Sequence, residues 1–335
     1  MAPKRKIIPI FIPHAGCKND CVFCDQRRIT GAEMPVIENG YLKIANLESV
    51  SLPAELAFYG GSFTAIPIEL QINLLEAAQS FLKSDPLNSI RISTRPDCLD
   101  DASINRLKYY GVTTVELGAQ SMCDDVLLQS QRGHTASDVE HASMLIKNSG
   151  LKLILQMMTG LPGDTREKSI YTAECFVKLK PDGVRVYPTV VVRGTKLHEL
   201  WERGVYKEHT VESAVELCSE LCPIFDKAGI PIIRLGLNPS ESLSAGDAVA
   251  GAYHPAFGEL VYSRMYYYDA VKLLDGVAPG SSITIAVPPG RVSIMTGQHR
   301  CNIDALIKKF SLHSLKVVEY NLKSNTKLDL HINND

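Results

Sequence analysis

Short apolar runs alternate with longer segments of helical periodicity along most of the chain. Between the apolar runs, apolar residues recur at helical spacing, as at Ile68, Ile72 and Leu75, and residues 211–228 form another long helical pattern. Strand and helix repeated about six times predict a parallel sheet with right-handed crossovers. The predicted strands are 7–12, 56–59, 90–94, 114–117, 153–157, 184–187 and 230–235.

Small and polar residues follow these predicted strands. No GxGxxG loop leads a strand, which argues against a dinucleotide-binding domain. In a parallel barrel the carboxyl ends of the strands share one rim, where active sites lie. The pattern therefore favours an α/β fold built as a partial, TIM-type (β/α)6 barrel. The residues after the first six strands are Cys17, Gly60-Gly61-Ser62, Arg95-Pro96-Asp97, Gln120-Ser121, Gly160 to Asp164 and Pro188.

After Gly276 the pattern changes to shorter elements. Two helices with the turn Gly297-Gln298-His299-Arg300 between them resemble a KH-like RNA-binding fold, although the second glycine of a GXXG loop is missing. We expect a barrel at 1–240, a helical connection on the substrate side at 241–280, and a small α+β domain at 281–335. The elements predicted here are strands 282–287, 315–322 and 327–332 and helices 291–295 and 302–310.

Composition restricts the class of protein. Of 335 residues, 45% are hydrophobic and 21% are charged, enough to bury a sizeable core. The net charge of −2 argues against a protein that coats nucleic acid, but it leaves room for a local basic patch. No apolar run reaches roughly 18 residues, and the N-terminus does not resemble a signal peptide. We therefore expect a cytoplasmic protein with no membrane span.

Three of the nine cysteines lie close together, in the order Cys-x3-Cys-x2-Cys. An odd number in an intracellular chain argues against a disulfide framework. Thiolates at Cys17, Cys21 and Cys24 suit a compact iron–sulfur cube, and three ligands leave one iron open. Phe23 is positioned to shield such a cluster from water. A zinc site with His14 as the fourth ligand is the chemical alternative.

The cysteine motif and its neighbours resemble a known family. Residues 12–31, 60–64, 93–97 and 116–121 are similar to motifs of radical SAM enzymes, closest to the branch of the Elongator catalytic subunit, over about residues 7–275. The resemblance implies a [4Fe-4S] cluster that reductively cleaves S-adenosylmethionine (SAM) to a 5′-deoxyadenosyl radical. It also implies a reductant such as flavodoxin or ferredoxin.

The resemblance also assigns roles to single residues. The glycine-rich turn would bind the amino group of SAM through its backbone, and Arg132 would pair with its carboxylate. Candidates for substrate contact or radical handling are Tyr187, Tyr253 and His254. The candidate cofactor contacts are Phe23, Gly60, Gly61, Ser62, Gln120, Ser121, Arg132 and Gln156, with Cys17, Cys21 and Cys24 as metal ligands.

The substrate is left open by these residues. The Elongator catalytic subunit modifies a wobble uridine in tRNA and carries an acetyltransferase domain, which we expect this chain to lack. The basic residues near the turn at 297–300 favour an enzyme that acts on RNA, with tRNA as the expected partner. The alternatives are a radical SAM enzyme that acts on a small metabolite such as a tetrapyrrole, and a non-catalytic metal-binding module that interacts with RNA.

Overall fold

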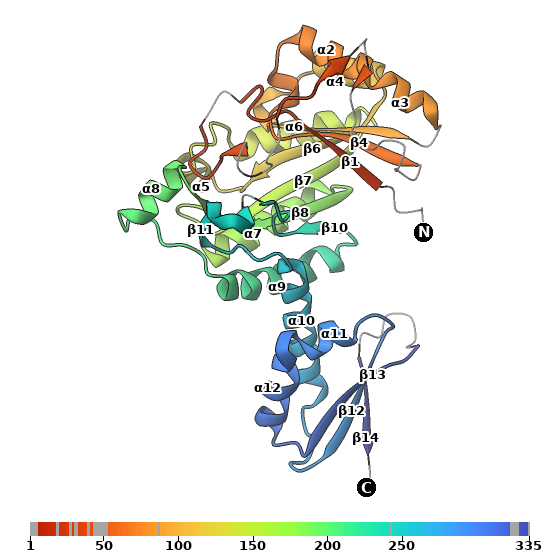
Figure 1. Cartoon of the computed structure of the whole chain (residues 1–335), viewed down its shortest axis with the longest axis vertical. Helices are drawn as coiled ribbons and strands as arrows, with labels where there is room; N and C mark the ends of the chain where they lie inside the picture. The colour runs from red at the N-terminus through yellow and green to blue at the C-terminus, as the bar shows by residue number, and fades with distance from the viewer. Residues whose placement is uncertain are drawn as a thin grey trace. The chain divides into compact units, whose positions relative to one another are not determined.

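The chain forms two compact units in the computed structural model (Figure 1). The first comprises Met1–Thr210 and Leu221–Tyr253, and the second comprises Val211–Glu220 and His254–Asp335. The structure describes residues 6–17, 20–26, 29, 33–38, 41–42, 53–85, 88–241, 243–321 and 328–333. Part of the cysteine motif, at 18–19, 27–28 and 30–31, lies outside these residues.

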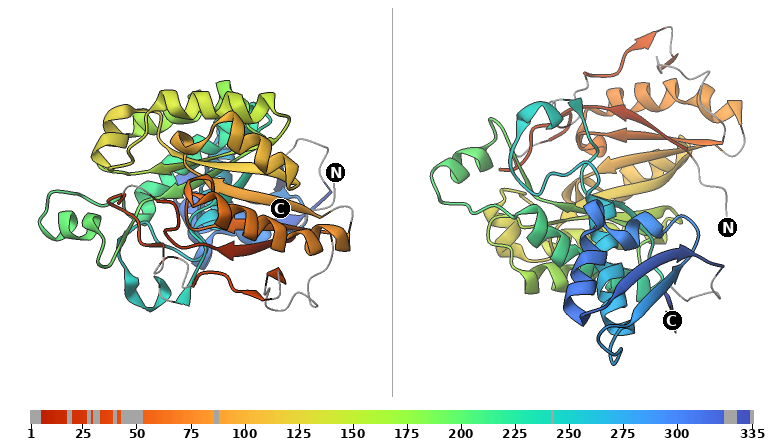
Figure 2. Two further views of the ribbon diagram at one scale, coloured as in Figure 1. Left: turned by 90° about the horizontal axis from the view of Figure 1, so that it is seen from above. Right: turned by 60° about the horizontal axis from the view of Figure 1, so that its bottom comes forward.

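The first unit is built on a parallel sheet whose strands lie in sequence order, β1-β4-β5-β6-β7-β8-β10. This order has no reversal, so successive right-handed crossovers place the connecting helices on one face and the sheet curls (Figure 2). The predicted partial barrel is confirmed as an open half-barrel, with seven strands in the described residues. Their bounds are β1 Lys6–Phe11, β4 Ala54–Tyr59, β5 Ser89–Thr94, β6 Val112–Gln120, β7 Lys152–Thr159, β8 Gly183–Pro188 and β10 Ile232–Leu235.

The outer face of the sheet is apolar and covered by helices. Leu56, Phe58 and Ile92 are fully buried there. Capping boxes begin two of the helices, at Asp100 and Thr135. Because side chains alternate along a strand, this arrangement sends every second residue to the inner face. The helices are α2 Ile68–Ala77, α3 Gln79–Ser84, α4 Asp101–Tyr109, α5 Asp124–Gln129, α6 Ala136–Asn148 and α7 Arg166–Leu179.

Short elements that periodicity did not predict complete the first unit. β9 (Val190–Val192) pairs antiparallel with β11 (Ala248–Gly251), and β2 (Ile37–Glu38) pairs with β3 (Tyr41–Leu42). The helix α8 (Lys196–Glu202) follows β9. Elements of two to seven residues are too short to establish a repeat in the sequence, so only tertiary contacts define them.

The second unit carries its own apolar core. In its sheet, β12 (Ser282–Val287) pairs parallel with β13 (Ser314–Glu319) and antiparallel with β14 (Asp329–Asn333). Besides Val211–Glu220, the compact unit takes in the chain from His254 on, whereas the sequence placed a separate connection at 241–280. The reason is that Tyr266 and Ala270 of α10, and Leu274 just after this helix, pack in the same core as β12. The helices are α10 Phe257–Leu273, α11 Val292–Thr296 and α12 Cys301–Phe310.

The helix α9 (Val211–Lys227) contributes its first residues to the second unit and its last to the first. Its predicted extent, 211–228, agrees to within one residue. Across the described ranges, no helix is both long and apolar enough to cross a membrane.

Candidate functional site

A cavity of about 620 Å³ lies inside the half-barrel. All seven parallel strands contribute to its lining, and every second residue does so on β1 (Ile7, Pro9, Phe11) and near the end of β6 (Glu116, Gly118). This volume is typical of sites for cofactors and small ligands. Of the residues predicted at the carboxyl ends of the strands, Cys17, Gly60, Gly61, Arg95, Gln120 and Pro188 line this cavity, whereas Gly160 to Asp164 line a separate pocket.

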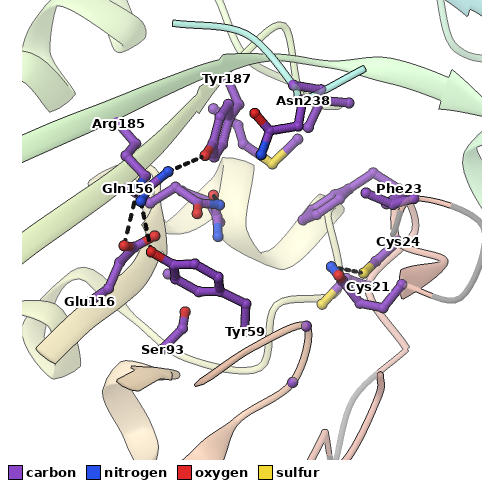
Figure 3. Close-up of a pocket in the computed structure, with 18 of the residues that line it drawn as sticks. Cys21, Phe23, Cys24, Tyr59, Ser93, Glu116, Gln156, Arg185, Tyr187 and Asn238 are labelled. Atoms are coloured by element: carbon purple, nitrogen blue, oxygen red, sulfur yellow. Dashed lines mark hydrogen bonds and ion pairs between the residues drawn. The ribbon is translucent and has the colours of Figure 1, made fainter. Parts of the chain in front are cut away.

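Cys17, Cys21 and Cys24 all line this cavity, and so does Phe23. Figure 3 shows Cys21, Phe23 and Cys24 on the same side of it. Backbone hydrogen bonds hold the segment between Cys21 and Cys24 in place. Val22 donates its N–H to the carbonyl of Ser130 at 3.2 Å and accepts from the N–H of Leu197 at 2.7 Å. Val22 and Phe23 are also buried against apolar residues of α5, α8 and β9. The fold thus presents the three predicted ligands on one wall.

The turn after β4 packs backbone to backbone against the segment that leads to Cys17. The N–H of His14 donates to the Gly60 carbonyl at 2.9 Å, and the N–H of Ser62 donates to the Ala15 carbonyl at 2.8 Å. A Cβ atom on Gly61 would lie 2.4 Å from the Ala15 oxygen. Gly61 is therefore required for this close approach.

Gly60 and Gly61 line the cavity, but Ser62 does not. The Ser62 hydroxyl is fully buried beside Thr94 Oγ1 at 2.9 Å and accepts from the N–H of Arg95 at 3.3 Å. Its side chain therefore ties the ends of β4 and β5 together. The predicted backbone contact of this turn with SAM stays a prediction.

The Arg132 side chain is buried next to the cysteines and is not exposed to solvent. Its Nη1 donates to Cys21 Sγ at 3.1 Å, and its Nη2 donates to the Gly118 carbonyl at 2.6 Å. The guanidinium of Arg95 holds the Arg132 carbonyl and also pairs with Asp97 at 2.9 Å. The Arg95–Asp97 ion pair thus supports Arg132.

The thiols sit in an environment that disfavours their charge. Burial raises the pKa of Cys24 to about 12, with Cys21 adding to the effect and Arg132 opposing it. Burial also raises the pKa of Cys17. Thiolate ligands at these positions therefore need added positive charge, which a bound metal centre supplies together with Arg132.

The donor set fits an iron–sulfur cluster better than a single zinc ion. His14 Nε2 accepts the N–H of Gln26 at 2.9 Å, so that nitrogen is already engaged. Three cysteine thiolates are the ligand set of an iron–sulfur cluster that keeps one iron open.

At the end of β6, one of two predicted cofactor contacts, Gln120, lies in the cavity and the other, Ser121, does not. Gln120 lines the cavity, and its Oε1 accepts from Gln156 Nε2 at 3.2 Å, so both glutamines lie at the site. Ser121 instead lies 3.4 Å from Thr172 Oγ1 of α7 and accepts from the N–H of Cys123. Ser121 follows the last residue of β6, after the left-handed backbone of Gln120 (φ 67°), and it does not line the cavity.

Four charged side chains, here called the charged row, are buried along the inner face. Glu116 lies between two arginines, at 3.0 Å from Arg185 and 3.5 Å from Arg91. Arg91 also pairs with Glu55 at 2.7 Å. Two carboxylates and two guanidinium groups are thus balanced in pairs, which is what burial of charge requires.

Two tyrosines join the charged row at Arg185. Arg185 Nη2 donates to the Tyr59 hydroxyl at 2.8 Å, and Nη1 donates to the Tyr187 hydroxyl at 3.1 Å (Figure 3). Burial raises the pKa of both phenols, so both are neutral. Sequence reasoning missed Tyr59. The sequence pattern that could have identified Tyr59 is the recurrence of polar residues at alternate positions in otherwise apolar strands.

Of the three predicted substrate contacts, the structure brings only Tyr187 to the cavity lining. The Tyr253 hydroxyl lies 2.9 Å from Ser244 Oγ, and its ring packs against Val190 and Val192. His254 belongs to the second unit, where its Nδ1 accepts the N–H of Ala256 at 3.1 Å. Tyr253 and His254 therefore do not line the cavity.

Comparison with known protein families gives matches over most of the chain. Residues 11–175 match the profile of the radical SAM superfamily, and residues 181–267 match that of the radical SAM C-terminal domain. The two matched regions together contain Cys17, Cys21 and Cys24 and every residue of the charged row.

Individual relatives agree with these matches. The tRNA uridine(34) acetyltransferase of Methanocaldococcus jannaschii is 34% identical over 249 residues, covering 67% of this chain and 44% of the relative. Human Elongator complex protein 3 is 33% identical over 187 residues, covering 50% of this chain and 34% of the relative. The chain thus spans less than half the length of these relatives.

A solved structure extends the similarity. The archaeal Elp3 of Methanocaldococcus infernus, with an N-terminal deletion, superposes with a TM-score of 0.61 at 26% identity, covering 83% of this chain and 70% of that one. The half-barrel and its order of strands are therefore those of a known enzyme fold.

The close approach at Gly61 generates a first prediction. Gly61→Ala would force a Cβ atom to within 2.4 Å of the Ala15 oxygen. We expect a loss of roughly 1–3 kcal/mol of stability and poor iron loading, measured by thermal unfolding and iron content after reconstitution. Gly183→Ala is the control, because a Cβ there meets the flexible end of Ile233. Equal melting temperature and iron content in wild type and Gly61→Ala would contradict the role given to this glycine.

His134 generates a second prediction. Burial, followed by the charge of Arg132, lowers its pKa to about 4 from 6.5. Between these values the unfolded chain binds more protons, so the free energy of unfolding should fall as pH falls from 6.5 toward 4. His134→Gln should reduce this slope by up to about 1.4 kcal/mol per pH unit, measured by urea unfolding at several pH values. The exposed His141→Gln should leave the slope unchanged, and an unchanged slope in His134→Gln would refute the assignment.

Proposed function

This chain belongs to the radical SAM superfamily, an enzyme superfamily that uses a [4Fe-4S] cluster and SAM, and on that premise we propose that it cleaves SAM reductively in order to modify tRNA. The observation that carries the proposal is the wall with Cys17, Cys21 and Cys24 in a cavity large enough for a cofactor and part of a substrate. Three thiol ligands suit a cluster that leaves one iron available.

The chain's own residues have distinct tasks in this proposal. Cys17, Cys21 and Cys24 would hold the cluster, which when bound supplies the electron that breaks a sulfur–carbon bond of SAM. Arg132 neutralises charge at the cysteines through its bond to Cys21 Sγ. Phe23 and the apolar residues packed behind it keep water from that wall. Exclusion of water strengthens each electrostatic contact at the site.

The residues around the cysteine wall suit the parts of SAM. Gly60 and Gly61 bring backbone groups to the cavity with no side chain in the way. Gln120 and Gln156, which bond to each other, present amide groups of the kind that bind a nucleoside. Ser121 has no part in this arrangement, because its hydroxyl lies at α7.

RNA is the proposed substrate class, and two kinds of observation support it. The relatives with the names tRNA uridine(34) acetyltransferase and Elongator complex protein 3 match the region that forms the cavity. In the second unit, the elements follow the order β12, α11, turn, α12, β13, and a turn between two helices supports the proposal of a KH-like unit. Exposed basic side chains lie on these elements, at Arg291, His299, Arg300, Lys308 and Lys309.

The chemistry generates a third prediction. After anaerobic reconstitution with iron and sulfide, reduction and addition of SAM, we expect 5′-deoxyadenosine, measured by mass spectrometry. Cys24→Ala should abolish it, whereas Cys301→Ala should not, because Cys301 is an exposed cysteine of the second unit. Unfractionated tRNA is added in a parallel sample, so that substrate-gated cleavage is also detected. No product in either sample, with a spectroscopically confirmed cluster, would refute the proposed function.

RNA binding generates a fourth prediction. Binding of unfractionated tRNA should weaken as salt rises, because phosphate contacts release counterions. Arg300→Glu should weaken it by roughly tenfold at low salt, measured by filter binding, since a charge reversal removes a favourable contact and adds repulsion. Arg203→Glu, a charge reversal on an exposed arginine of the first unit, is the control. Equal binding by the two variants and wild type would count against RNA contact at the turn.

A further inference from the structure

A second pocket, of about 380 Å³, lies in the first unit. Three segments that are distant in the sequence line it: the end of α5 at Gln129, the loop 160–164 between β7 and α7, and parts of the segment 200–209. Among the described residues, none lines both this pocket and the cavity with the cysteines. A pocket of this volume suits a small ligand, and the proposed function gives it no role.

Two glycines in the loop 160–164 let side chains of the other segments come close. Gly160 and Gly163 both have left-handed backbone, with φ of 75° and 77°. A Cβ atom on Gly160 would lie 2.9 Å from Cγ of His209, and one on Gly163 would collide with the amide of Gln129. The loop therefore needs glycine at both positions in order to hold His209 and Gln129 at the pocket.

The carbonyl oxygens of the two glycines are already bonded within the protein. The Gly160 carbonyl accepts from the Tyr206 hydroxyl at 2.6 Å. The Gly163 carbonyl accepts from Lys168 Nζ, also at 2.6 Å. A ligand in the pocket therefore finds these backbone acceptors occupied.

The carboxylate of Asp164 is likewise bonded to its own surroundings. It accepts from the N–H of Gly160 at 2.8 Å, the Ser169 hydroxyl at 2.7 Å and the N–H of Thr165 at 2.9 Å. The N–H of Asp164 in turn donates to the Leu161 carbonyl at 2.9 Å. Asp164 therefore serves to hold the loop together, and its oxygens are not left for a ligand that donates hydrogen bonds.

The side-chain donors of the pocket, by contrast, have no partner within the described part of the chain. They are the amide of Gln129 and the ammonium group of Lys207, both exposed, and the ring of His209. Nδ1 of His209 is enclosed without a hydrogen bond, so Nε2 is the ring nitrogen left for a ligand. Burial lowers the pKa of His209, so the ring is neutral near pH 7 and carries one N–H. Free donors beside occupied acceptors are the complement of an anion with several acceptor oxygens.

Apolar side chains form the rest of the lining, at Leu161, Pro162, Leu200 and Val205. Leu161 and Leu200 are held from behind, because they belong to the apolar cluster that also packs against Phe23. Val205 is 66% exposed, so its surface is open to a ligand. An inorganic anion would leave this apolar surface in water, whereas an organic group attached to the anion would cover it.

We propose that this pocket binds a small organic phosphate monoester, with its phosphate at Lys207, Gln129 and His209 and its organic part against the apolar side chains. A phosphate has several acceptor oxygens, and a lysine ammonium group is a strong partner for it. The site is separate from the cavity, so this inference goes beyond the proposed function and does not depend on it.

The test is equilibrium dialysis of the reconstituted full chain with phenyl phosphate as the probe. Phenol, which lacks the phosphate, should bind at least roughly tenfold more weakly. Inorganic phosphate, which lacks the ring, should bind roughly threefold or more weakly, because the apolar side chains stay uncovered. Unfractionated tRNA is added as a competitor in a parallel sample.

Variants assign the binding to this pocket. Lys207→Ala should weaken the binding of phenyl phosphate roughly tenfold, and Gln129→Leu should weaken it roughly threefold. Both side chains are exposed, so neither change should prevent folding. Lys178→Ala, which removes an exposed lysine of α7, and Arg300→Glu in the second unit should each leave the affinity unchanged.

Three results would overturn the inference. They are the lack of saturable binding of phenyl phosphate below about 10 mM, equal affinity in Lys207→Ala and wild type, and displacement of phenyl phosphate by tRNA together with loss of tRNA affinity in Lys207→Ala. The last result would assign the pocket to a phosphate of the RNA backbone and not to a small molecule. Formation of 5′-deoxyadenosine that depends on Cys24 would stand in each case, so the two proposals fail separately.

Discussion

The pairing of buried charge inside the half-barrel is the constraint on which the rest of the structure depends. A curled parallel sheet with an internal cavity needs polar groups on its inner face, yet isolated charges there would be costly. Glu116 resolves this by lying between Arg91 and Arg185, with Glu55 on the far side of Arg91. These residues come from four strands, so the charged row also fixes how the strands face one another.

A second constraint joins the cysteines to this frame. The segment before Cys17 contacts the turn after β4 through backbone groups alone, at Gly60, Gly61 and Ser62. Gly16 and Gly61 have no room for a side chain, because an added Cβ atom on either would lie closer than 2.5 Å to a carbonyl oxygen. The wall of the cavity that carries the thiols is thereby set by the same strand that supplies Glu55 and Tyr59.

The two sides of the cavity therefore differ in chemistry for a physical reason. Near the cysteines, Arg132 provides positive charge beside groups that must become thiolates. Near β8 and β10, Arg185 is paired with Glu116 and bonded to two phenols, and Arg234 is bonded to two backbone carbonyls.

The sequence by itself determined the order of strands and helices, the half-barrel and the cysteine wall, because long periodic segments and a tight cysteine spacing are local signals. It also located Gly60, Gly61, Gln120, Arg132, Gln156 and Tyr187 at the cavity. Tertiary structure alone decided that Ser62, Ser121, Tyr253 and His254 do not line the cavity and that Tyr59 and Asn238 do. Which face a strand-end residue takes, and which loop returns over the sheet, depends on register and on packing between distant segments, and no local pattern in the sequence encodes these.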